Sequence, residues 1–392
     1  MERMSPLHVL LDPVARVLRA SPLAGRLWAR FRSWKLERNA RRILASGDGR
    51  AGRLPEGVVF EATMRCNLHC EFCYVGTLLN IEGEWRQELT LDVLERAFPE
   101  QHGLQISLTG GEVFVRKDIV DAMELFRGKG YVCGYLTTNG TAITEQRAEA
   151  LAQLALKGFI KHVSVSIDGP PEVHDVARGA KGTFEQTARG LRRLQAAAAR
   201  TGAPLRVSIN TTVASQSIDA LDRMVDVAGE LGVDAIGLNH LMYSTPEEVD
   251  ETLRLLGLDD PSLIATYITR DPGVKPDRVR TQVAALQEKC RRRGIKFDFR
   301  PRVWPGIVDA YYTPGEKLAG RCLYPFRNAR VGFSGKVYFC PFIRVEVGDL
   351  TTQTLEAAWT SERYVEMRRQ LLTHGLFPVC RRCCKVELQR PE

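Results

Sequence analysis

The sequence predicts an α/β protein built on one barrel-like parallel sheet, with a basic arm before it and a small cysteine-rich domain after it. Short strand candidates and helical stretches alternate from residue 57 to residue 300. Consecutive parallel strands need a helix-length return, and that return is right-handed. We therefore expect a helical arm and linker over 1–56, the barrel over 57–300 and the cysteine-rich domain over 301–392.

Six strand candidates support the barrel. They are short and rich in apolar or β-branched residues, and they cover 58–62, 104–108, 131–137, 162–167, 205–211 and 235–238. Helical candidates follow at 91–98, 119–128, 145–156, 184–198, 218–231 and 279–293. Six such units make a partial (β/α)6 barrel, an open relative of the eight-stranded TIM barrel, whose functional residues gather at the C-terminal ends of the strands. The acidic segment 244–278 is expected to cap the barrel mouth or to link the last helix.

Length and composition fit a globular protein rather than a membrane-spanning one. The 392 residues can bury a full core, and no run approaches the eighteen apolar residues that a membrane span needs. Asp12, Pro13 and Arg16 interrupt the early apolar stretch, so it does not resemble a secretory signal. Ten cysteines without such a signal predict a cytoplasmic protein whose thiolates bind metal rather than form disulfides.

Positive charge is concentrated in the arm. Residues 1–50 hold eleven Lys and Arg against four Asp and Glu, which is +7 of the chain's +8. The rest of the chain offers no basic field for a phosphate backbone, so we expect no nucleic-acid partner. Leu, Trp and Phe recur among the arginines at roughly helical spacing. Three interpretations stay open for the arm: helices packed on the barrel, an amphipathic helix on the anionic inner face of a membrane, or a dock for a partner protein.

Three cysteines follow the first strand candidate at compact spacing. Cys66, Cys70 and Cys73 form a CxxxCxxC pattern without a fourth cysteine nearby. Thiolates hold iron–sulfur clusters in sets of four, so three suggest a [4Fe–4S] cluster with one iron open to chemistry. A structural zinc site is the alternative, although its usual pattern is two CxxC pairs or a mixture of Cys and His.

This spacing resembles that of the radical SAM superfamily, in which such a cluster binds S-adenosylmethionine (SAM). In that family, reduction of the cluster cleaves SAM to methionine and a 5′-deoxyadenosyl radical, which takes a hydrogen atom from the substrate. The resemblance implies that Cys66, Cys70 and Cys73 are cluster ligands. The residue before the third cysteine is usually aromatic and lies near the adenine; Phe72 holds that place here, with Tyr74 just beyond.

Later strand ends carry motifs similar to the superfamily's SAM-binding motifs. Gly110, Gly111 and Glu112 resemble the motif that receives the methionine amino group. Two glycines let the backbone approach a ligand closely, and the resemblance makes Glu112 a cofactor ligand rather than a general base. Residues 137–140, Thr-Thr-Asn-Gly, resemble a family turn, and the same residues suit an ordinary turn.

The fourth and fifth strand candidates supply further contacts. The strand period of two places Ser164, Ser166 and Asp168 on one face, where they can hydrogen-bond a ribose. The run resembles the family's SxDG ribose motif. The resemblance also makes Arg178 the partner of the SAM carboxylate, because a guanidinium grips a carboxylate through two hydrogen bonds; a surface ion pair is the alternative. Asn210 matches a position that often contacts SAM.

A second cysteine set lies in the last seventy residues. Twelve residues separate Cys322 from Gly335, and a CxxCC run lies near the end. This spacing resembles the SPASM and twitch domains that follow some radical SAM barrels. The chain continues eight residues past Cys384, so we expect one auxiliary [4Fe–4S] cluster, the twitch arrangement. The resemblance gives as ligands Cys322, Cys340, Cys380 and Cys383, with Cys384 able to replace Cys383; a zinc ribbon is the alternative.

The resemblance defines the cofactors more closely than the substrate. Four thiolates would close the auxiliary site to substrate, which favours electron transfer as the role of that cluster. A cluster that accepts electrons suits a two-electron, dehydrogenase-like oxidation. We expect the substrate to be a small molecule or a lipid-linked molecule. His240 and Tyr243, after the sixth strand candidate, are the candidate catalytic residues, with core packing as the alternative for His240. We expect an electron donor such as flavodoxin or ferredoxin. The competing hypotheses are a peptide-modifying maturase or epimerase of the SPASM type and a non-catalytic iron–sulfur or zinc protein.

Overall fold

The computed structural model describes residue 34 and residues 37–390, and the chain falls into two units, 1–49 and 50–392. In the first unit the described residues are helical over 37–46. Trp34 is 55% exposed, and the guanidinium of Arg38 lies over its ring. Most of the arm for which we expected an amphipathic helix lies outside the described residues.

A ten-stranded sheet organises the second unit, in the order β13-β12-β11-β1-β2-β3-β4-β5-β6-β9. Neighbours run parallel from β11 through β1 to β9, whereas β12 and β13 join antiparallel. The strands are β1 (Gly57–Thr63), β2 (Gln105–Gly110), β3 (Val132–Thr138), β4 (His162–Ser166), β5 (Arg206–Thr212), β6 (Ala235–Asn239), β9 (Lys296–Arg300), β11 (Asn328–Val331), β12 (Lys336–Tyr338) and β13 (Glu346–Asp349).

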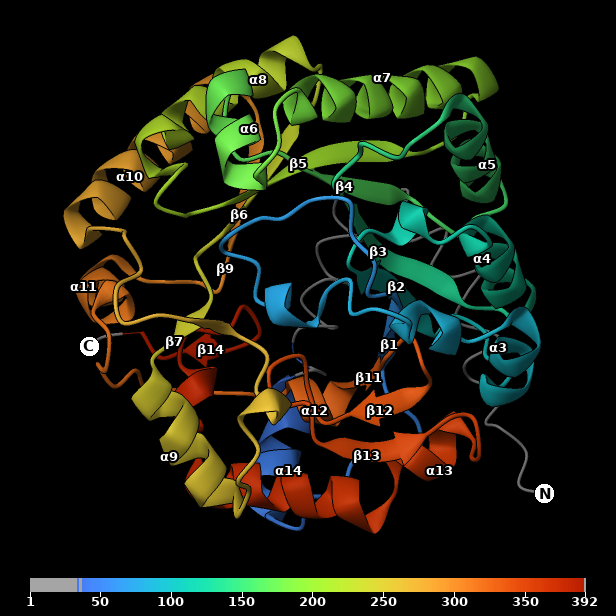
Figure 1. The fold of residues 1–392 in the computed structure, drawn as a ribbon, viewed down its shortest axis with the longest axis vertical. Coiled ribbons are helices and arrows are strands. Elements are labelled where there is room, and N and C mark those ends of the chain that lie inside the picture. The colour runs from blue at the N-terminus through green and yellow to red at the C-terminus, as the bar shows by residue number, and fades with distance from the viewer. Residues whose placement is uncertain (1–33, 35–36, 391–392) are drawn as a thin grey trace. The chain divides into compact units, whose positions relative to one another are not determined.

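Helices fill the crossovers between the parallel strands. They are α3 (Leu91–Ala97), α4 (Ile119–Gly128), α5 (Glu145–Leu156), α7 (Thr183–Thr201), α8 (Met224–Glu230) and α10 (Pro276–Arg293). Figure 1 shows them on the outside of the curved sheet, with the strands on the inside. The predicted α/β partial barrel, with its small cysteine-rich C-terminal domain, is confirmed.

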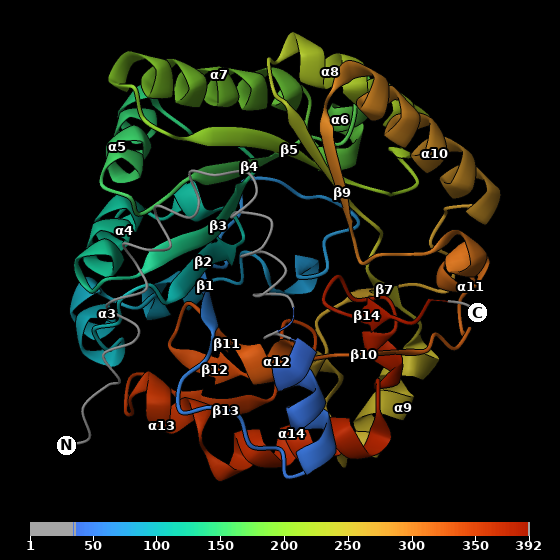
Figure 2. The ribbon, with the colours of Figure 1, turned by 180° about the vertical axis from the view of Figure 1, so that it is seen from behind.

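Shorter elements complete the second unit. The remaining α-helices are α6 (Pro171–Arg178), α9 (Pro246–Leu256), α11 (Val308–Tyr312), α12 (Tyr324–Arg327), α13 (Leu355–Trp359) and α14 (Glu362–His374). Two small sheets pair β7 (Tyr243–Ser244) with β8 (Tyr267–Ile268), and β10 (Gly320–Arg321) with β14 (Glu387–Leu388). Figure 2 shows β10 and β14 next to each other from the reverse side.

Aromatic packing fixes the helices on the outer face of the first strands. Phe60 of β1 meets Phe98 and Phe126 edge to face at 6.2 and 6.0 Å between ring centres. Phe126 and Tyr131 pack in the same way at 5.8 Å. Because Phe60 faces outward, the strand alternation turns Glu61 and Thr63 to the inner face of the sheet. The core on the helix side therefore determines which polar residues of β1 face the barrel interior.

Strand β1 joins the barrel to the cysteine-rich segment. It pairs with β2 on one side and with β11 on the other, with Val59 opposite Arg330 in the register. One continuous sheet therefore contains both the barrel strands and the C-terminal strands β11, β12 and β13.

Helix α9 lies in the segment expected to cap the barrel or link its last helix. It begins with a capping box at Thr245 and Glu248. Val379 donates a backbone hydrogen bond of 3.2 Å to the Thr252 hydroxyl, so α9 holds the turn that precedes Cys380. Among the described residues, the structure contains no helix with the length and apolarity to cross a membrane.

Candidate active site

The loop after β1 carries Cys66, Cys70 and Cys73, whose thiols lie within one another's electrostatic reach. Asn80 holds this loop: its amide oxygen accepts from the Cys66 N–H and its amide nitrogen donates to the Cys66 carbonyl, both at 2.9 Å. Asn80 has φ of 59°, a left-handed conformation in which asparagine is enriched. No sequence motif pointed to this residue.

Gly110 and Gly111 are required by a close approach between two backbone segments. A Cβ on Gly110 would lie 2.1 Å from the Thr63 carbonyl oxygen, and one on Gly111 would lie 2.3 Å from that of Arg65. At this approach the Gly111 and Glu112 N–H groups donate to those carbonyls at 2.8 and 2.9 Å. The glycines therefore allow the end of β2 to bond to the start of the cysteine loop, a role additional to the close approach of a ligand.

Glu112 is buried beside the cysteine loop. Its carboxylate accepts from the Thr138 hydroxyl at 2.7 Å, from the Asn139 N–H at 2.6 Å and from the Phe114 N–H at 3.1 Å. Burial raises the pKa of Glu112, and these neutral donors only partly oppose the rise. A carboxylate held by neutral donors in a buried place gains strongly from an added cation, so this position suits an ammonium ligand.

The Thr-Thr-Asn-Gly turn also contacts the cysteine loop. The Asn139 amide donates to the Asn67 side-chain oxygen at 3.0 Å, and the Asn67 amide donates to the Thr141 hydroxyl at 2.8 Å. The turn thus positions the cysteine loop from the end of β3, in addition to bonding Glu112.

Asp168 and Arg178 form an ion pair at 2.6 Å beside the second cysteine. The Thr212 N–H donates to the other oxygen of Asp168 at 2.8 Å. The Arg178 guanidinium lies 3.7 Å from the Cys70 sulfur and 5.8 Å from the centre of the Phe72 ring. Burial would lower the pKa of Arg178, but the Asp168 carboxylate and the Cys70 thiol outweigh it and raise the pKa. Two residues predicted to bind different parts of SAM are therefore partners of each other.

The remaining predicted SAM contacts lie on the inner face of β4 and β5. In the register Ser164 is opposite Ser208, and Ser166 is opposite Asn210. The Asn210 side-chain oxygen accepts from the Asn239 amide at 2.8 Å. Ser164 and Asn210 remain partly exposed, so this polar row is accessible from the barrel interior.

Tyr74 turns away from the other predicted SAM contacts. Its hydroxyl accepts from Arg330 of β11 at 3.1 Å, and its ring lies 5.8 Å from Phe342. Arg330 and Arg344 both pair with the fully buried Glu61, each at 2.7 Å. We call these four residues, Glu61, Tyr74, Arg330 and Arg344, the interdomain network. It links the residue after Cys73 to the segment that contains Cys340.

The C-terminal cysteines gather near this network. Cys322, Cys340 and Cys380 interact electrostatically with one another, and Cys383 interacts with Cys322. Four cysteine thiolates are the ligand set that a [4Fe–4S] cluster takes, so the chemistry of these donors fits an iron–sulfur cluster. The neighbouring Cys383 thiol outweighs burial and lowers the pKa of Cys384.

Arg382, inside the CxxC of this set, anchors it to the rest of the protein. Its buried guanidinium donates to Glu248 at 2.8 Å and to the carbonyls of Tyr311 and Thr313, both at 2.7 Å. The position of the two cysteines at 380 and 383 is thus set by α9 and α11.

His240 and Tyr243, the candidate catalytic residues, are both buried. His240 Nδ1 lies 2.8 Å from the Tyr312 hydroxyl, and burial lowers the pKa of His240 to about 3. Tyr243 donates to the Tyr311 carbonyl at 2.9 Å. These contacts show packing between the barrel and α11, and a catalytic role for either residue stays a prediction that the contacts do not support.

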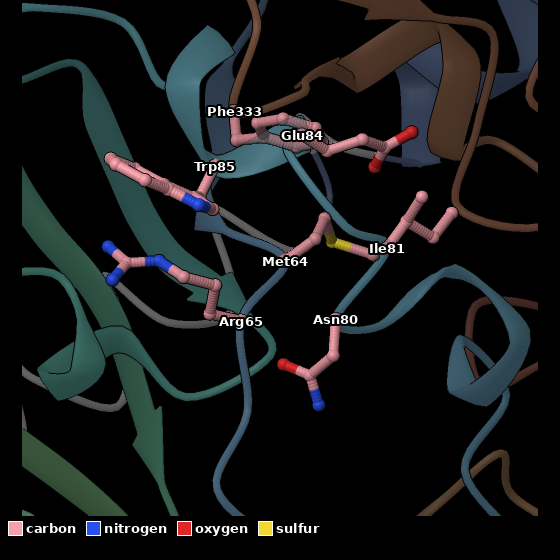
Figure 3. A pocket seen from close by; sticks show the side chains of 7 residues that line it. All are labelled: Met64, Arg65, Asn80, Ile81, Glu84, Trp85 and Phe333. Atoms are coloured by element: carbon pink, nitrogen blue, oxygen red, sulfur yellow. The ribbon is translucent and has the colours of Figure 1, made fainter.

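Figure 3 shows a small pocket beside the cysteine loop. It is lined by Met64, Arg65, Asn80, Ile81, Glu84, Trp85 and Phe333. The lining includes Asn80, which bonds the Cys66 backbone, but no predicted SAM contact. The pocket is therefore not the candidate cofactor site.

Comparisons with known proteins agree with this geometry. The Radical SAM superfamily model matches residues 60–226, and the SPASM iron–sulfur cluster-binding domain model matches residues 322–384. An AdoMet-dependent heme synthase of Oleidesulfovibrio alaskensis is 32% identical over 326 residues, covering 80% of this chain and 76% of the relative. A PqqA peptide cyclase of Streptomyces rochei is 34% identical over 191 residues, covering 48% of this chain and 49% of the relative.

Solved structures share the fold. SuiB of Streptococcus suis, bound to the precursor peptide SuiA, has a TM-score of 0.57 at 15% identity, covering 86% of this chain and 72% of SuiB. The structure of anSMEcpe with bound AdoMet has a TM-score of 0.56 at 18% identity, covering 79% of this chain and 78% of that one. The chain belongs to the radical SAM superfamily, as an enzyme whose barrel binds a [4Fe–4S] cluster and SAM and whose SPASM domain binds auxiliary iron–sulfur.

Proposed function

We propose that this radical SAM enzyme carries out a two-electron, dehydrogenase-like oxidation of a small-molecule or lipid-linked substrate. Bound SAM, cleaved with one electron, supplies a 5′-deoxyadenosyl radical that removes one hydrogen atom from the substrate. The substrate radical then loses one electron and one proton, so the substrate loses two hydrogens in total. An auxiliary cluster held by the C-terminal cysteines would accept the electron, and the proton would leave to solvent.

The interdomain network is the observation that carries this proposal. Tyr74 directly follows the last cysteine of the SAM loop, and Arg330 bonds both Tyr74 and Glu61. Arg330 also lies opposite Tyr338 in the β11–β12 pairing, two residues before Cys340. One buried set of polar contacts therefore spans the distance between the two cysteine sets, which supports electron transfer between the substrate site and the SPASM domain.

The proposal assigns roles to the residues around the cysteine loop. Cys66, Cys70 and Cys73 hold the SAM-binding cluster, and Glu112 receives the SAM ammonium in its buried set of donors. Arg178 grips the SAM carboxylate, which requires it to share or leave Asp168. The other proposed SAM contacts are Phe72, Gly110, Gly111, Ser164, Ser166, Asp168 and Asn210, whereas Tyr74, expected from the sequence to contact SAM, belongs to the interdomain network. The proposed auxiliary ligands are Cys322, Cys340, Cys380 and Cys383, with Cys384 as the alternative to Cys383.

Anaerobic incubation with SAM, reductant and a cell extract, followed by mass spectrometry, tests the oxidation. We expect a product two hydrogens lighter than its substrate, formed in a one-to-one ratio with 5′-deoxyadenosine. The Cys322→Ala variant should still cleave SAM but should lose the product. A product of unchanged mass, or one equally abundant in the Cys322→Ala variant, would contradict the proposed oxidation.

A peptide-modifying maturase or epimerase is the second candidate. The likeness to a PqqA peptide cyclase over about half of the chain favours it. The same mass spectrometry separates the two candidates, because a peptide product would be found in the protease-sensitive fraction of the extract.

We further propose that a small redox protein such as flavodoxin or ferredoxin supplies the electron, and that the basic arm contacts an anionic membrane surface. Exposed charges are screened over about 10 Å at 0.1 M salt. Sedimentation with anionic vesicles should therefore occur at low salt and be reversed by high salt, whereas salt-independent binding would argue against the membrane contact.

A further inference from the structure

The surroundings of the auxiliary cysteines carry more positive than negative charge. On the β1 side, Arg330 and Arg344 share one carboxylate, that of Glu61. The side chains of Arg330 and Arg344 are 3% and 8% exposed, and that of Glu61 is 0% exposed. One positive charge is therefore left over in a place that water hardly reaches.

A second positive group lies next to the CxxCC run. The Lys385 ammonium lies 5.6 Å from the centre of the Tyr135 ring and 5.9 Å from that of Tyr324. These are cation–π contacts, which do not cancel its charge. On the opposite side, Arg381 and Arg382 share the single carboxylate of Glu248. Glu387, the carboxylate near Cys322, is itself paired with Arg321 and Arg327, so the charged groups named around the cysteine set sum to a positive charge.

Backbone N–H groups add to this field. Ile343 donates to the Cys340 sulfur at 3.2 Å, and Lys385 donates to the Cys383 sulfur at 3.5 Å. Arg330 lies opposite Tyr338, two residues before Cys340, in the β11–β12 pairing, and the Arg344 guanidinium lies 3.9 Å from the centre of the Tyr338 ring. Both guanidinium groups therefore lie beside the strand that leads to Cys340.

A four-thiolate cluster becomes more negative by one charge when it takes up an electron. Net charge, hydrogen bonds to the sulfurs and solvent exposure set the reduction potential of such a cluster. Buried positive charge and N–H donors favour the reduced form, and they act more strongly in a poorly solvated place.

We propose that Arg330, Arg344 and Lys385 are positioning residues for electron transfer that raise the reduction potential of the auxiliary cluster, with Glu61 as the opposing charge. This deepens the proposed function, on which it rests, because a raised potential suits a cluster that accepts the electron of a substrate radical. This potential is that of the auxiliary cluster's redox couple, in which the oxidised cluster takes up one electron and no bond forms.

The test is a redox titration of the auxiliary cluster followed by electron paramagnetic resonance. The full chain with Cys66, Cys70 and Cys73 changed to Ala is reconstituted anaerobically, so that the signal of the reduced auxiliary cluster is recorded alone. In this background the matched variants are Arg330→Gln, which removes a positive charge, and Glu61→Gln, which removes a negative one. Lys129→Gln is the control, because Lys129 pairs with Glu95 on the helix side of the barrel.

Arg330→Gln should lower the potential and Glu61→Gln should raise it. A unit charge about 10 Å away at an effective dielectric constant of about 20 changes the ratio of reduced to oxidised cluster by roughly tenfold. A tenfold change is about 59 mV for a one-electron couple. Arg330→Lys keeps the charge and should stay close to the parent, as should Lys129→Gln.

Opposite shifts support charge as the cause, because a loosened network would move both variants in one direction. Shifts of the same sign, or none, would overturn the proposal. If Arg330→Gln fails to hold iron, Lys385→Gln takes its place and should likewise lower the potential; an unchanged potential there would count against the proposal. The titration contains no substrate, so its failure is distinct from failure to find an oxidised product.

Discussion

Replacing Arg382 with methionine should loosen the C-terminal cysteines, whereas the same change at the adjacent Arg381 should not. Arg382 is buried and donates to Glu248 and to several carbonyls of the segment 310–316. Arg381 is 12% exposed, and its guanidinium lies 3.5 Å from the Glu248 carboxylate. Both residues lie in the same CxxC, and each carries one positive charge. Comparing the two variants therefore isolates the effect of the buried contacts.

The expected magnitude follows from these contacts. Removing one partner of a buried ion pair costs about 3–5 kcal/mol, because the remaining charge and the carbonyls lose their donor. For a chain of this length that loss lowers the apparent melting temperature by roughly 4–6 °C. Arg381→Met should cost about 1 kcal/mol or less, as expected for a partly solvated pair at a longer distance.

The assay is thermal unfolding by circular dichroism under anaerobic conditions at one scan rate, together with iron content per chain. Arg382→Met should melt earlier than the parent and lose iron from the auxiliary site, while Arg381→Met should match the parent in both measurements. Equal melting temperatures for the two variants would refute the assignment of the anchor to the buried contacts of Arg382.

Three further predictions concern the barrel. Asn80→Ala should lower the iron content of the SAM-binding site, because the Cys66 backbone loses both of its hydrogen bonds to Asn80. Iron per chain is compared with that of Cys322→Ala, the reference for loss of the other site, and full iron content in Asn80→Ala would contradict this role. Gly110→Ala should be insoluble and Gly128→Ala soluble, since an added Cβ meets a carbonyl at 2.1 Å at the first position and open space at the second; a folded Gly110→Ala protein would show that the approach can relax. Burial would raise the pKa of Glu61, but its two arginines outweigh this and lower it from 4.5 to about 2. Its ionised form therefore contributes about 3 kcal/mol of stability above pH 4.5 that is lost as the pH falls toward 2, and urea unfolding of Glu61→Gln should show a shallower pH dependence in this window.

The sequence was sufficient to predict the barrel and the place of the cysteine loop. Apolar strands alternate with helices of ordinary length, so the crossover rules leave few arrangements. The motif at Gly110 and Gly111 was also predictable, although its physical reason was not. That reason is a backbone contact with Thr63 and Arg65, more than forty residues earlier, which no local pattern specifies.

The interdomain network was missed, although one signal for it was present. Glu61 interrupts an apolar strand candidate, and a buried carboxylate needs a cation. Its partners lie 269 and 283 residues away in the chain and reach it only because β11 adds to the edge of the barrel. Sequence periodicity does not identify that pairing.

Two further expectations failed to include contacts made within the protein. The sequence motifs predict that Asp168 and Arg178 bind different parts of SAM, but α6, which ends at Arg178, brings the two side chains together. Its place after a strand predicts a catalytic role for His240, whereas α11, which begins at Val308, covers it with aromatic rings. In both cases the partner lies on an element whose docking no local pattern reveals.

The measurement that tests the central claim most directly is the formation of 5′-deoxyadenosine by the anaerobically reconstituted chain with SAM and dithionite. We predict slow release of 5′-deoxyadenosine and methionine in equal amounts without added substrate, retained in the Cys322→Ala variant and abolished when Cys66, Cys70 and Cys73 are changed to Ala. Persistence of cleavage in the triple variant, or its absence from fully iron-loaded wild-type protein, would contradict the assignment of these three cysteines as the site of SAM chemistry.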